Sequence, residues 1–444
     1  MTIHTKRNDS GALKGLRIVD LTRVLAGPFC TMLLADMGAE VIKVEGPGKG
    51  DDARDYPPFL RGTSAYFANL NRNKKSVVLD LKKPEARRIL LDLVKDSDVL
   101  LENFKPGTME KLGLGYETVR ECNPRIIYAS ISGFGQYGPY KDRPGYDIIG
   151  QAMGGLMSVS GWPDSPPTRT GTAMADIVAG LNACVGILAA LRGREQTGVG
   201  ERIDVALVDS MVSAMETVIQ IYLVEGRIPQ RVGNRYEFIA PYDSFEAKDG
   251  WVVIGVGGQE VWKRFCQVIS REELLEDPEF LTNKDRVKNV ARLEKVVTEW
   301  TSQRSVADIV SSLLEASVPC SPILDVEQIC KDPHIAGARG MIVEMDHPLG
   351  GKMNAVSCPI KFTGMETAIR SAAPLYGEHT EQVLIDILEL SKEAVIQLRK
   401  IGAIGGAPPD ERAKADTPDT EGRTLKGEAT ARRKREGRRT RGQA

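Results

Sequence analysis

A single carboxylate, Asp176, stands at the beginning of a long segment of apolar and small residues, "DIVAGLNACVGILAAL". Aspartate is a preferred residue at a helix N-terminus, where its side chain caps free N–H groups. The helix dipole also stabilises a carboxylate there, and an ionised carboxylate can act as a nucleophile. The alanines and glycines that follow allow a second backbone to approach closely, either for tight packing or to leave room for a ligand. The residue types alone do not decide whether Asp176 is a helix cap or a nucleophile. They also do not decide whether the small residues serve packing or ligand binding.

Most familiar catalytic and cofactor-binding motifs are missing from the sequence. Residues 16–45 imitate the opening of a dinucleotide-binding fold, but "RVLAGP" holds one glycine where that motif needs three. The sequence contains neither a P-loop nor a G-x-S-x-G nucleophile elbow. Four scattered histidines lack the spacing of metal ligands: His4, His334, His347 and His379. We therefore expect carboxylate chemistry, with no metal.

The composition is that of an ordinary globular protein. The chain has 444 residues, of which 42% are hydrophobic and 27% charged, and its net charge is −1. This length favours two domains, and the balanced charge does not indicate a nucleic-acid or membrane partner. Seven cysteines, an odd number without a C-x-x-C pair, favour reduced thiols and a cytoplasmic location. Because no apolar run approaches about 20 residues, we expect no membrane-spanning helix.

Short apolar strands alternate with helical segments through the first half of the chain. We expect strands at 16–21, 40–45, 76–81, 98–104, 125–133 and 201–207, with helices between them. This alternation is typical of a parallel sheet covered on both faces, so we predict an α/β fold. Residues 1–226 are assigned to the first part of this large domain.

The alternation of strands and helices ends at about residue 226. A hairpin with its turn at 248–250, followed by helical segments, predicts a smaller α+β domain at 227–325. Residues 326–404 contain a second hairpin and two helices, and we assign them to a return segment that completes the large domain. The composition of residues 405–444, with eleven Lys and Arg against seven Asp and Glu, predicts a disordered basic tail. A nucleic-acid contact by this tail is the less favoured alternative.

Several motifs in the same order resemble one known family. They include "LKGLRIVDLTRVLAGPFCTMLLADMGAEVIKVE", "NRNKKSVVLDLK", "DVLLENFKPGTMEKLGLGY", "RPGYD" and "GTAMADIVAGLNACVGILAAL". Over residues 13–404 the chain resembles the class III CoA-transferases, the family of formyl-CoA and carnitine CoA-transferases. Within that family it is most similar to the members that use succinyl-CoA and glutarate. The resemblance implies a Rossmann-like large domain built from N- and C-terminal segments, a smaller domain, and two chains interlocked as a homodimer.

The resemblance also implies a mechanism and a set of site residues. Asp176 matches the nucleophile of the family, which forms an aspartyl anhydride and then an enzyme–CoA thioester. CoA thioesters are substrates, the partner is a carboxylic acid, and no permanently bound cofactor is expected. The positions that match CoA contacts are Leu25, Ala26, Leu79, Asp80, Leu81, Lys82, Asn103, Phe104, Lys105, Lys111, Pro144, Gly145, Tyr146 and Asp147. Gly257, Gly258 and Gln259 match a glycine loop that covers the substrate.

The identity of the acceptor is less well indicated. Formyl-CoA transferase has glutamine where this chain has Leu25 and arginine where it has Gly46, which disfavours oxalate. We expect a dicarboxylate such as glutarate, and we place the recognition of its second carboxylate near Arg23, Arg72 or the glycine loop. A formyl-CoA:oxalate or carnitine-type transferase is the alternative. An acyl-CoA racemase is less favoured, because the histidine base of that relative is replaced by Tyr146.

Overall fold

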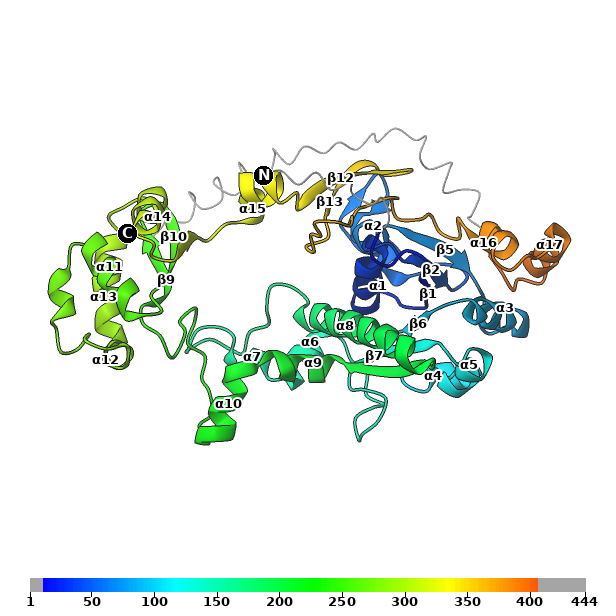
Figure 1. The fold of residues 1–444 in the computed structure, drawn as a ribbon, viewed down its shortest axis with the longest axis horizontal. Helices are drawn as coiled ribbons and strands as arrows, with labels where there is room; N and C mark the ends of the chain where they lie inside the picture. Colours follow the sequence, from blue (N-terminus) through cyan, green and yellow to red (C-terminus); the bar gives the residue numbers. More distant parts are fainter. Residues whose placement is uncertain (1–10, 406–444) are drawn as a thin grey trace, which may run out of the picture.

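The structure is a computed structural model, and it describes residues 11–405. The predicted basic tail therefore lies, apart from Gly405, outside the described residues. The described chain forms a large part around one parallel sheet and a smaller part around an antiparallel sheet (Figure 1).

A six-stranded sheet is the centre of the large part. All its pairings are parallel, in the order β5-β2-β1-β6-β7-β8. The strands are β1 Arg17–Asp20, β2 Glu40–Glu45, β5 Lys74–Val78, β6 Val99–Glu102, β7 Ile127–Ser132 and β8 Glu201–Ala206. The predicted α/β class is confirmed, and each strand predicted for this sheet is present, at 40–45 with the predicted bounds and elsewhere with bounds that differ by one to three residues.

Strand β5 differs most from the prediction. Apolar residues placed this strand at 76–81, but it begins at Lys74 and ends at Val78. Lys74 is only 2% exposed, and its ammonium lies 3.2 Å from a carboxylate oxygen of buried Asp20 on β1. In the sequence Lys74 looks like a surface residue, because lysine is usually exposed. Its charge can be buried here only because Asp20, on a strand far away in the sequence, pairs with it.

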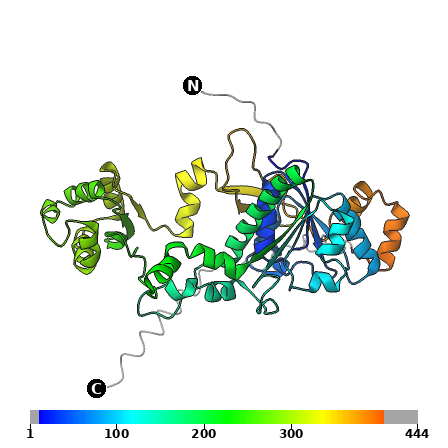
Figure 2. The same cartoon turned by 60° about the horizontal axis from the view of Figure 1, so that its bottom comes forward.

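Helices cover both faces of this sheet (Figure 2). On one face lie α1 Ala26–Asp36 and α8 Met174–Thr197, whose side chains share a core with alternate residues of the strands. The other face packs against α3 Pro84–Lys95, α5 Tyr116–Cys122, α16 Thr380–Asp386 and α17 Lys392–Lys400. The last two helices come from the C-terminal segment, which also pairs Ile404 with Leu79 at the end of β5.

Helix α8 corrects one expectation from the sequence. Among the described residues it is the one unbroken helix long and apolar enough to cross a membrane, with a mean hydropathy of 1.9. We expected no such segment. Its alanine and glycine residues pack against α1, and Ala175, Ala179, Ala183 and Ile187 belong to the core of the large part. Only 39% of its apolar stretch is buried, and Leu181 and Val185 are 43% and 66% exposed, so packing within the described chain accounts for one side of the helix.

The smaller part has its own sheet and core. Strands β9 Tyr242–Ala247, β10 Gly250–Gly255 and β11 Cys320–Pro322 are antiparallel. They pack against α11 Gln259–Val268, α13 Val290–Thr301 and α14 Val306–Glu315, with α12 Asn283–Lys288 at the edge. The expected hairpin turn at 248–250 is confirmed. The predicted domain limits at 226 and 325 stay predictions, which this separate core supports.

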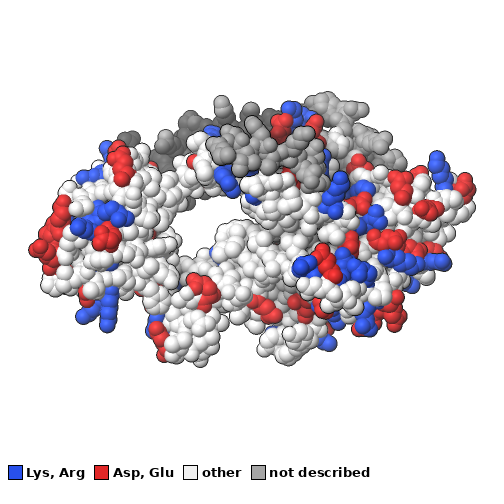
Figure 3. All heavy atoms as spheres, viewed as in Figure 1, with Lys and Arg blue, Asp and Glu red and all other residues white. Residues whose placement is uncertain are grey.

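Two connections join the parts. The first contains α9 Leu207–Ala214 and α10 Glu216–Glu225, and the second contains α15 Val326–Lys331 before the hairpin β12 Ile342–His347 and β13 Gly351–Val356. They run along opposite sides of the molecule (Figure 1). The space-filling view shows an opening between them (Figure 3).

Candidate active site

The order of the parallel strands marks one place in the sheet for a ligand. The chain passes from β1 to β2 and β5 on one side, and then returns to β6 on the other side of β1. At such a switch point the loops after the two strands diverge and leave a crevice at their carboxyl ends. Here these loops are residues 21–25, after β1, and 103–107, after β6.

Two adjoining cavities occupy this crevice. The first has a volume of about 340 Å³ and the second about 420 Å³. Arg23, Phe104 and Thr108 line both, so the two cavities meet at these side chains. An elongated ligand such as a CoA thioester could extend from one cavity into the other, because their combined size is within the range of small-molecule sites.

The structure brings together most of the residues singled out in the sequence. Leu79, Asp80, Leu81, Lys82 and Phe104 line the first cavity. The second is lined by Leu25, Ala26, Asn103, Phe104, Lys105, Pro144, Gly145, Tyr146 and Asp176. Lys111, Asp147 and the stretch Gly257–Gln259 are not among the described residues that line either cavity.

Asp176 is the third residue of α8, and its side chain does not cap the helix. The cap comes from Asp147, at the start of α6 Asp147–Met153, which accepts a hydrogen bond of 2.9 Å from the Ala175 N–H. The other oxygen of Asp147 accepts one of 2.8 Å from the Gln151 amide. Within residues 11–405 the carboxyl group of Asp176 has no hydrogen bond, and it faces the second cavity. Capping is therefore the task of Asp147, and the Asp176 carboxyl group stays accessible to a ligand.

The environment of Asp176 disfavours its charge. Burial raises the pKa of Asp176 to about 7, and the nearby carboxylate of Asp147 adds to the rise. The sequence led us to expect an anion stabilised by the helix dipole, so the direction of the pKa shift is a correction. The group is close to half ionised at neutral pH, and a carboxylate with a raised pKa is also a stronger base and nucleophile.

The small residues of α8 bring this helix close to α1. A Cβ added at Gly180 would lie 2.6 Å from the carbonyl oxygen of Ala26. Gly180 is one turn after Asp176, and Ala26 follows directly after the β1 loop. Tight packing therefore explains the glycine, and it places Asp176 beside the beginning of α1.

A tyrosine near Asp176 was missed by the sequence reasoning. Tyr66, on α2 Ala65–Asn71, contacts Tyr56 with ring centroids 5.7 Å apart. Burial raises the pKa of the Tyr66 phenol well above its usual value, and the charge of Asp176 contributes. Its hydroxyl group therefore stays protonated as a hydrogen-bond donor. The segment "TSAYFANLN" contains no motif that distinguishes Tyr66 from a core aromatic residue.

The two arginines proposed for the acceptor differ in their surroundings. Arg72 is fully buried, and its guanidinium pairs with Asp36 at 2.7 Å and donates to the Asn69 carbonyl oxygen at 2.8 Å. It holds α2 against α1, so the hypothesis that Arg72 recognises the acceptor is wrong. The side chain of Arg23 is 54% exposed at the junction of the cavities, with Asp52 at 3.4 Å.

Comparisons with known proteins agree with this architecture. The sequence model of CoA-transferase family III matches residues 13–380. An acetyl-CoA:oxalate CoA-transferase from Acetobacter aceti is 42% identical over 82% of this chain and 93% of its own length. The succinyl-CoA:glutarate CoA-transferase of Mus musculus is 39% identical over 88% of this chain and 90% of its own length. The crystal structure of a CAIB/BAIF family protein from Brucella suis has a TM-score of 0.76 at 38% identity, and covers 85% of this chain and 100% of that chain. This chain therefore belongs to CoA-transferase family III and is an enzyme that transfers CoA.

Proposed function

We propose that the enzyme moves CoA from succinyl-CoA to a dicarboxylate acceptor, with Asp176 as the covalent nucleophile. The observation that carries this proposal is the Asp176 carboxyl group, which faces the cavity at the switch point without a hydrogen bond in the described chain. A nucleophile needs such freedom, and the Asp147 cap provides it by satisfying the helix start in its place.

The reaction balances without a metal, ATP or a net proton. The Asp176 carboxylate attacks the thioester carbonyl carbon, the C–S bond breaks, and CoA thiolate leaves an aspartyl–succinyl anhydride. The thiolate attacks the aspartyl carbonyl, which releases succinate and forms an enzyme–CoA thioester. The acceptor carboxylate displaces CoA from that thioester, and the thiolate then attacks the acceptor carbonyl of the new anhydride. This step regenerates Asp176 and yields the new acyl-CoA.

Each intermediate hydrolyses readily, so water must be kept from Asp176. The apolar side chains of Leu25 and Leu207 line the same cavity and exclude part of the solvent. Gly257–Gln259 lie at the start of α11 in the smaller part. A covering role for this loop requires that it approach the cavity from outside, either by movement of the smaller part or from a second chain.

Trapping of the intermediate tests the covalent role. Wild-type enzyme, incubated with succinyl-CoA and hydroxylamine, should carry a hydroxamate on the peptide that contains Asp176, as measured by mass spectrometry. Asp176→Asn should bind CoA normally, give no hydroxamate and lose transfer activity by at least about 10⁴-fold, since the covalent path is removed. Undiminished turnover by this variant would refute the assignment.

The acceptor is best tested by competition. The relatives include one enzyme named for oxalate and one named for glutarate at similar sequence identity, so sequence identity does not decide between these two acceptors. We favour glutarate because Leu25 and Gly46 stand where formyl-CoA transferase has polar residues. With succinyl-CoA as donor, glutarate should exceed oxalate in kcat/KM. A tenfold preference for oxalate, about 1.4 kcal/mol in transition-state stabilisation, would reverse the ranking.

Two further proposals concern assembly and location. We infer that the enzyme is an interlocked homodimer, supported by the opening between its parts (Figure 3) and by exposed apolar side chains along the first connection. Leu223 and Val224 of α10 are 65% and 79% exposed. A cytoplasmic location is supported by the seven cysteines, all of which are free thiols.

A further inference from the structure

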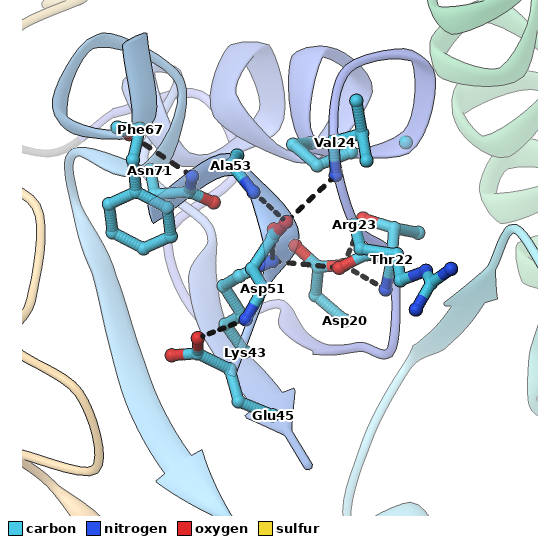
Figure 4. A network of polar contacts seen from close by, with 12 residues as sticks. Asp20, Thr22, Arg23, Val24, Lys43, Glu45, Asp51, Ala53, Phe67 and Asn71 are labelled. Carbon is cyan, nitrogen blue, oxygen red and sulfur yellow. Dashed lines mark hydrogen bonds and ion pairs between the residues drawn. The ribbon is translucent and has the colours of Figure 1, made fainter. Parts of the chain in front are cut away.

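The loop at Thr22–Val24, between β1 and α1, is bound by side chains rather than by other backbone. The Thr22 N–H donates to Asp20 at 2.8 Å, and the Thr22 carbonyl oxygen accepts from the Lys43 ammonium at 2.7 Å. The Val24 N–H donates to an oxygen of Asp51 at 3.0 Å. Figure 4 shows the residues that hold the loop: Asp20 from β1, Lys43 from β2 and Asp51 from the segment after β2.

Arg23, in the middle of this loop, is bound on both sides by one amide. Its N–H donates to the Asn103 side-chain oxygen at 3.0 Å, and its carbonyl oxygen accepts from the Asn103 side-chain nitrogen at 2.8 Å. Asn103 follows β6, directly before Phe104. The amide therefore ties together the two loops of the switch point, at the side chains where the two cavities meet.

Val24 has a backbone conformation that its side chain disfavours. Its φ angle is 67°, in the left-handed region. A β-branched residue rarely adopts this region, and such conformations cost on the order of 1–3 kcal/mol. They persist only where surrounding contacts fix the backbone. Here Asp51 accepts from the Val24 N–H, and Asn103 binds both backbone polar groups of Arg23, the residue before Val24. Val24 lines the Asp176 cavity, so a relaxed loop would change the shape of that cavity.

Asp51 is itself held in place by a buried network. Its second carboxylate oxygen lies 2.7 Å from the Lys43 ammonium, and both side chains are at most 1% exposed. Its first oxygen also accepts from the Ala53 N–H at 3.0 Å, and its own N–H donates to Glu45 at 3.0 Å. Burial alone would raise the pKa of Asp51, but the Lys43 ammonium and the hydrogen bonds lower it overall. The acceptor for the Val24 N–H is therefore a fixed, ionised carboxylate.

We propose that Asn103 and Asp51 are positioning residues for CoA transfer, which act by holding the backbone of Arg23 and of the left-handed Val24 at the edge of the Asp176 cavity. The side-chain oxygen and nitrogen of Asn103 each make one hydrogen bond to the Arg23 backbone. Asn103 therefore affects the reaction through the loop, whereas its resemblance to family positions implied a direct CoA contact. The proposal rests on the proposed function only in taking the Asp176 cavity as the place of reaction.

The chain offers a matched control for Asn103. The Asn123 amide nitrogen donates to the carbonyl oxygens of Val94 and Ser97 at 2.8 and 2.9 Å, and its oxygen accepts from the Arg125 N–H at 3.0 Å. Its amide thus also binds backbone groups through both its nitrogen and its oxygen, but to three residues instead of one. It precedes β7, at the amino ends of the strands, whereas the cavities lie at the carboxyl ends. A role limited to folding would give both asparagines the same effect on activity.

The test uses Asn103→Ala, Val24→Gly, the double variant and Asn123→Ala. We expect Asn103→Ala to lower kcat/KM about 10- to 50-fold, mainly through kcat, while the Kd for free CoA changes less than threefold. Glycine adopts a φ of 67° without strain. In the Val24→Gly background, Asn103→Ala should therefore lower kcat/KM less than fivefold. Amide exchange in the peptide covering residues 21–29 should rise in Asn103→Ala and fall back in the double variant.

The outcomes separate this proposal from the previous one. Asn123→Ala should lower the Tm but leave kcat/KM within twofold of wild type. The proposal is overturned if Asn103→Ala keeps wild-type kcat/KM, if its loss is equal in both Val24 backgrounds, or if Asn123→Ala loses as much activity. Rates are measured with the acid that wild type converts fastest. Transfer by wild type without an Asp176 hydroxamate would therefore refute the covalent mechanism and leave the loop comparison decisive.

Discussion

At the scale of single residues, two aspartates on different helices divide capping and chemistry between them. Asp147 accepts the Ala175 N–H of α8, and Asp176 faces the cavity. The proximity of Asp147 also raises the pKa of Asp176, in addition to burial. The reactivity of the proposed nucleophile thus depends on a neighbour that need not contact the substrate.

The pKa of Asp176, raised to about 7, predicts a pH-dependent activity. Only the ionised carboxylate is nucleophilic, so log kcat/KM should rise with a slope of one below about pH 7 and level off above it. Asp147→Asn keeps an oxygen for the Ala175 N–H but removes the charge, so its acidic limb should move to lower pH. A profile that is flat from pH 5.5 to 8, or one that Asp147→Asn does not move, would contradict this.

The same pKa has a consequence for stability. Asp176 binds its proton more tightly folded than unfolded, so its contribution to the free energy of unfolding falls as pH rises from about 4 to about 7. Asp176→Asn has no ionisable group at this position, so it does not lose this stability as pH rises. Its Tm should therefore exceed that of wild type more at pH 8 than at pH 5, as measured by calorimetry in the same buffers.

At the scale of elements, the contact between α1 and α8 decides where Asp176 lies. The β1 loop leads into α1, the glycine and alanine surface of α8 lies against it, and Gly180 leaves no room for a Cβ beside the Ala26 carbonyl oxygen. The cavity is therefore built by two helices that are far apart in the chain, and both are anchored on the same face of the sheet.

Gly180→Ala should disturb this contact. The added Cβ would meet the backbone oxygen of Ala26 at 2.6 Å, so α8 must shift, at a cost of roughly 1–3 kcal/mol. We expect a lower Tm and a kcat reduced at least tenfold, since Asp176 is one turn away. Gly193→Ala is the control on the same helix, because nothing lies within 4 Å of its added Cβ. It should be neutral or slightly stabilising, and equal losses in both variants would contradict the packing argument.

At the scale of the whole molecule, the chain forms two packed parts joined by two connections on opposite sides (Figure 1). The C-terminal segment returns to the large sheet, where α16 and α17 cover one face. The first connection contains α9 and α10, and α10 presents apolar side chains to the surface.

This arrangement predicts that the folded enzyme does not exist as a stable monomer. Leu223 and Val224 are too exposed for a surface that meets only water, and a second chain that covers them would bury this area. Sedimentation of the purified protein at micromolar concentration should show a dimer. Leu223→Asp with Val224→Asp should weaken the dimer and lower activity together. A fully active wild-type monomer would refute this prediction.

The sequence by itself determined the α/β class, the alternation of strands and helices, and the segment that begins with Asp176, because these depend on periodicity and on motifs within about 20 residues. It also assembled most of the cavity-lining residues, through the resemblance of their motifs to one family. Tertiary structure alone decided that Lys74 and Arg72 are buried ion-pair partners, that Asp147 caps α8, and that Tyr66 lies near Asp176. The charge, proton affinity and partners of these side chains depend on residues far away in the chain, and only the folded packing brings such residues into contact.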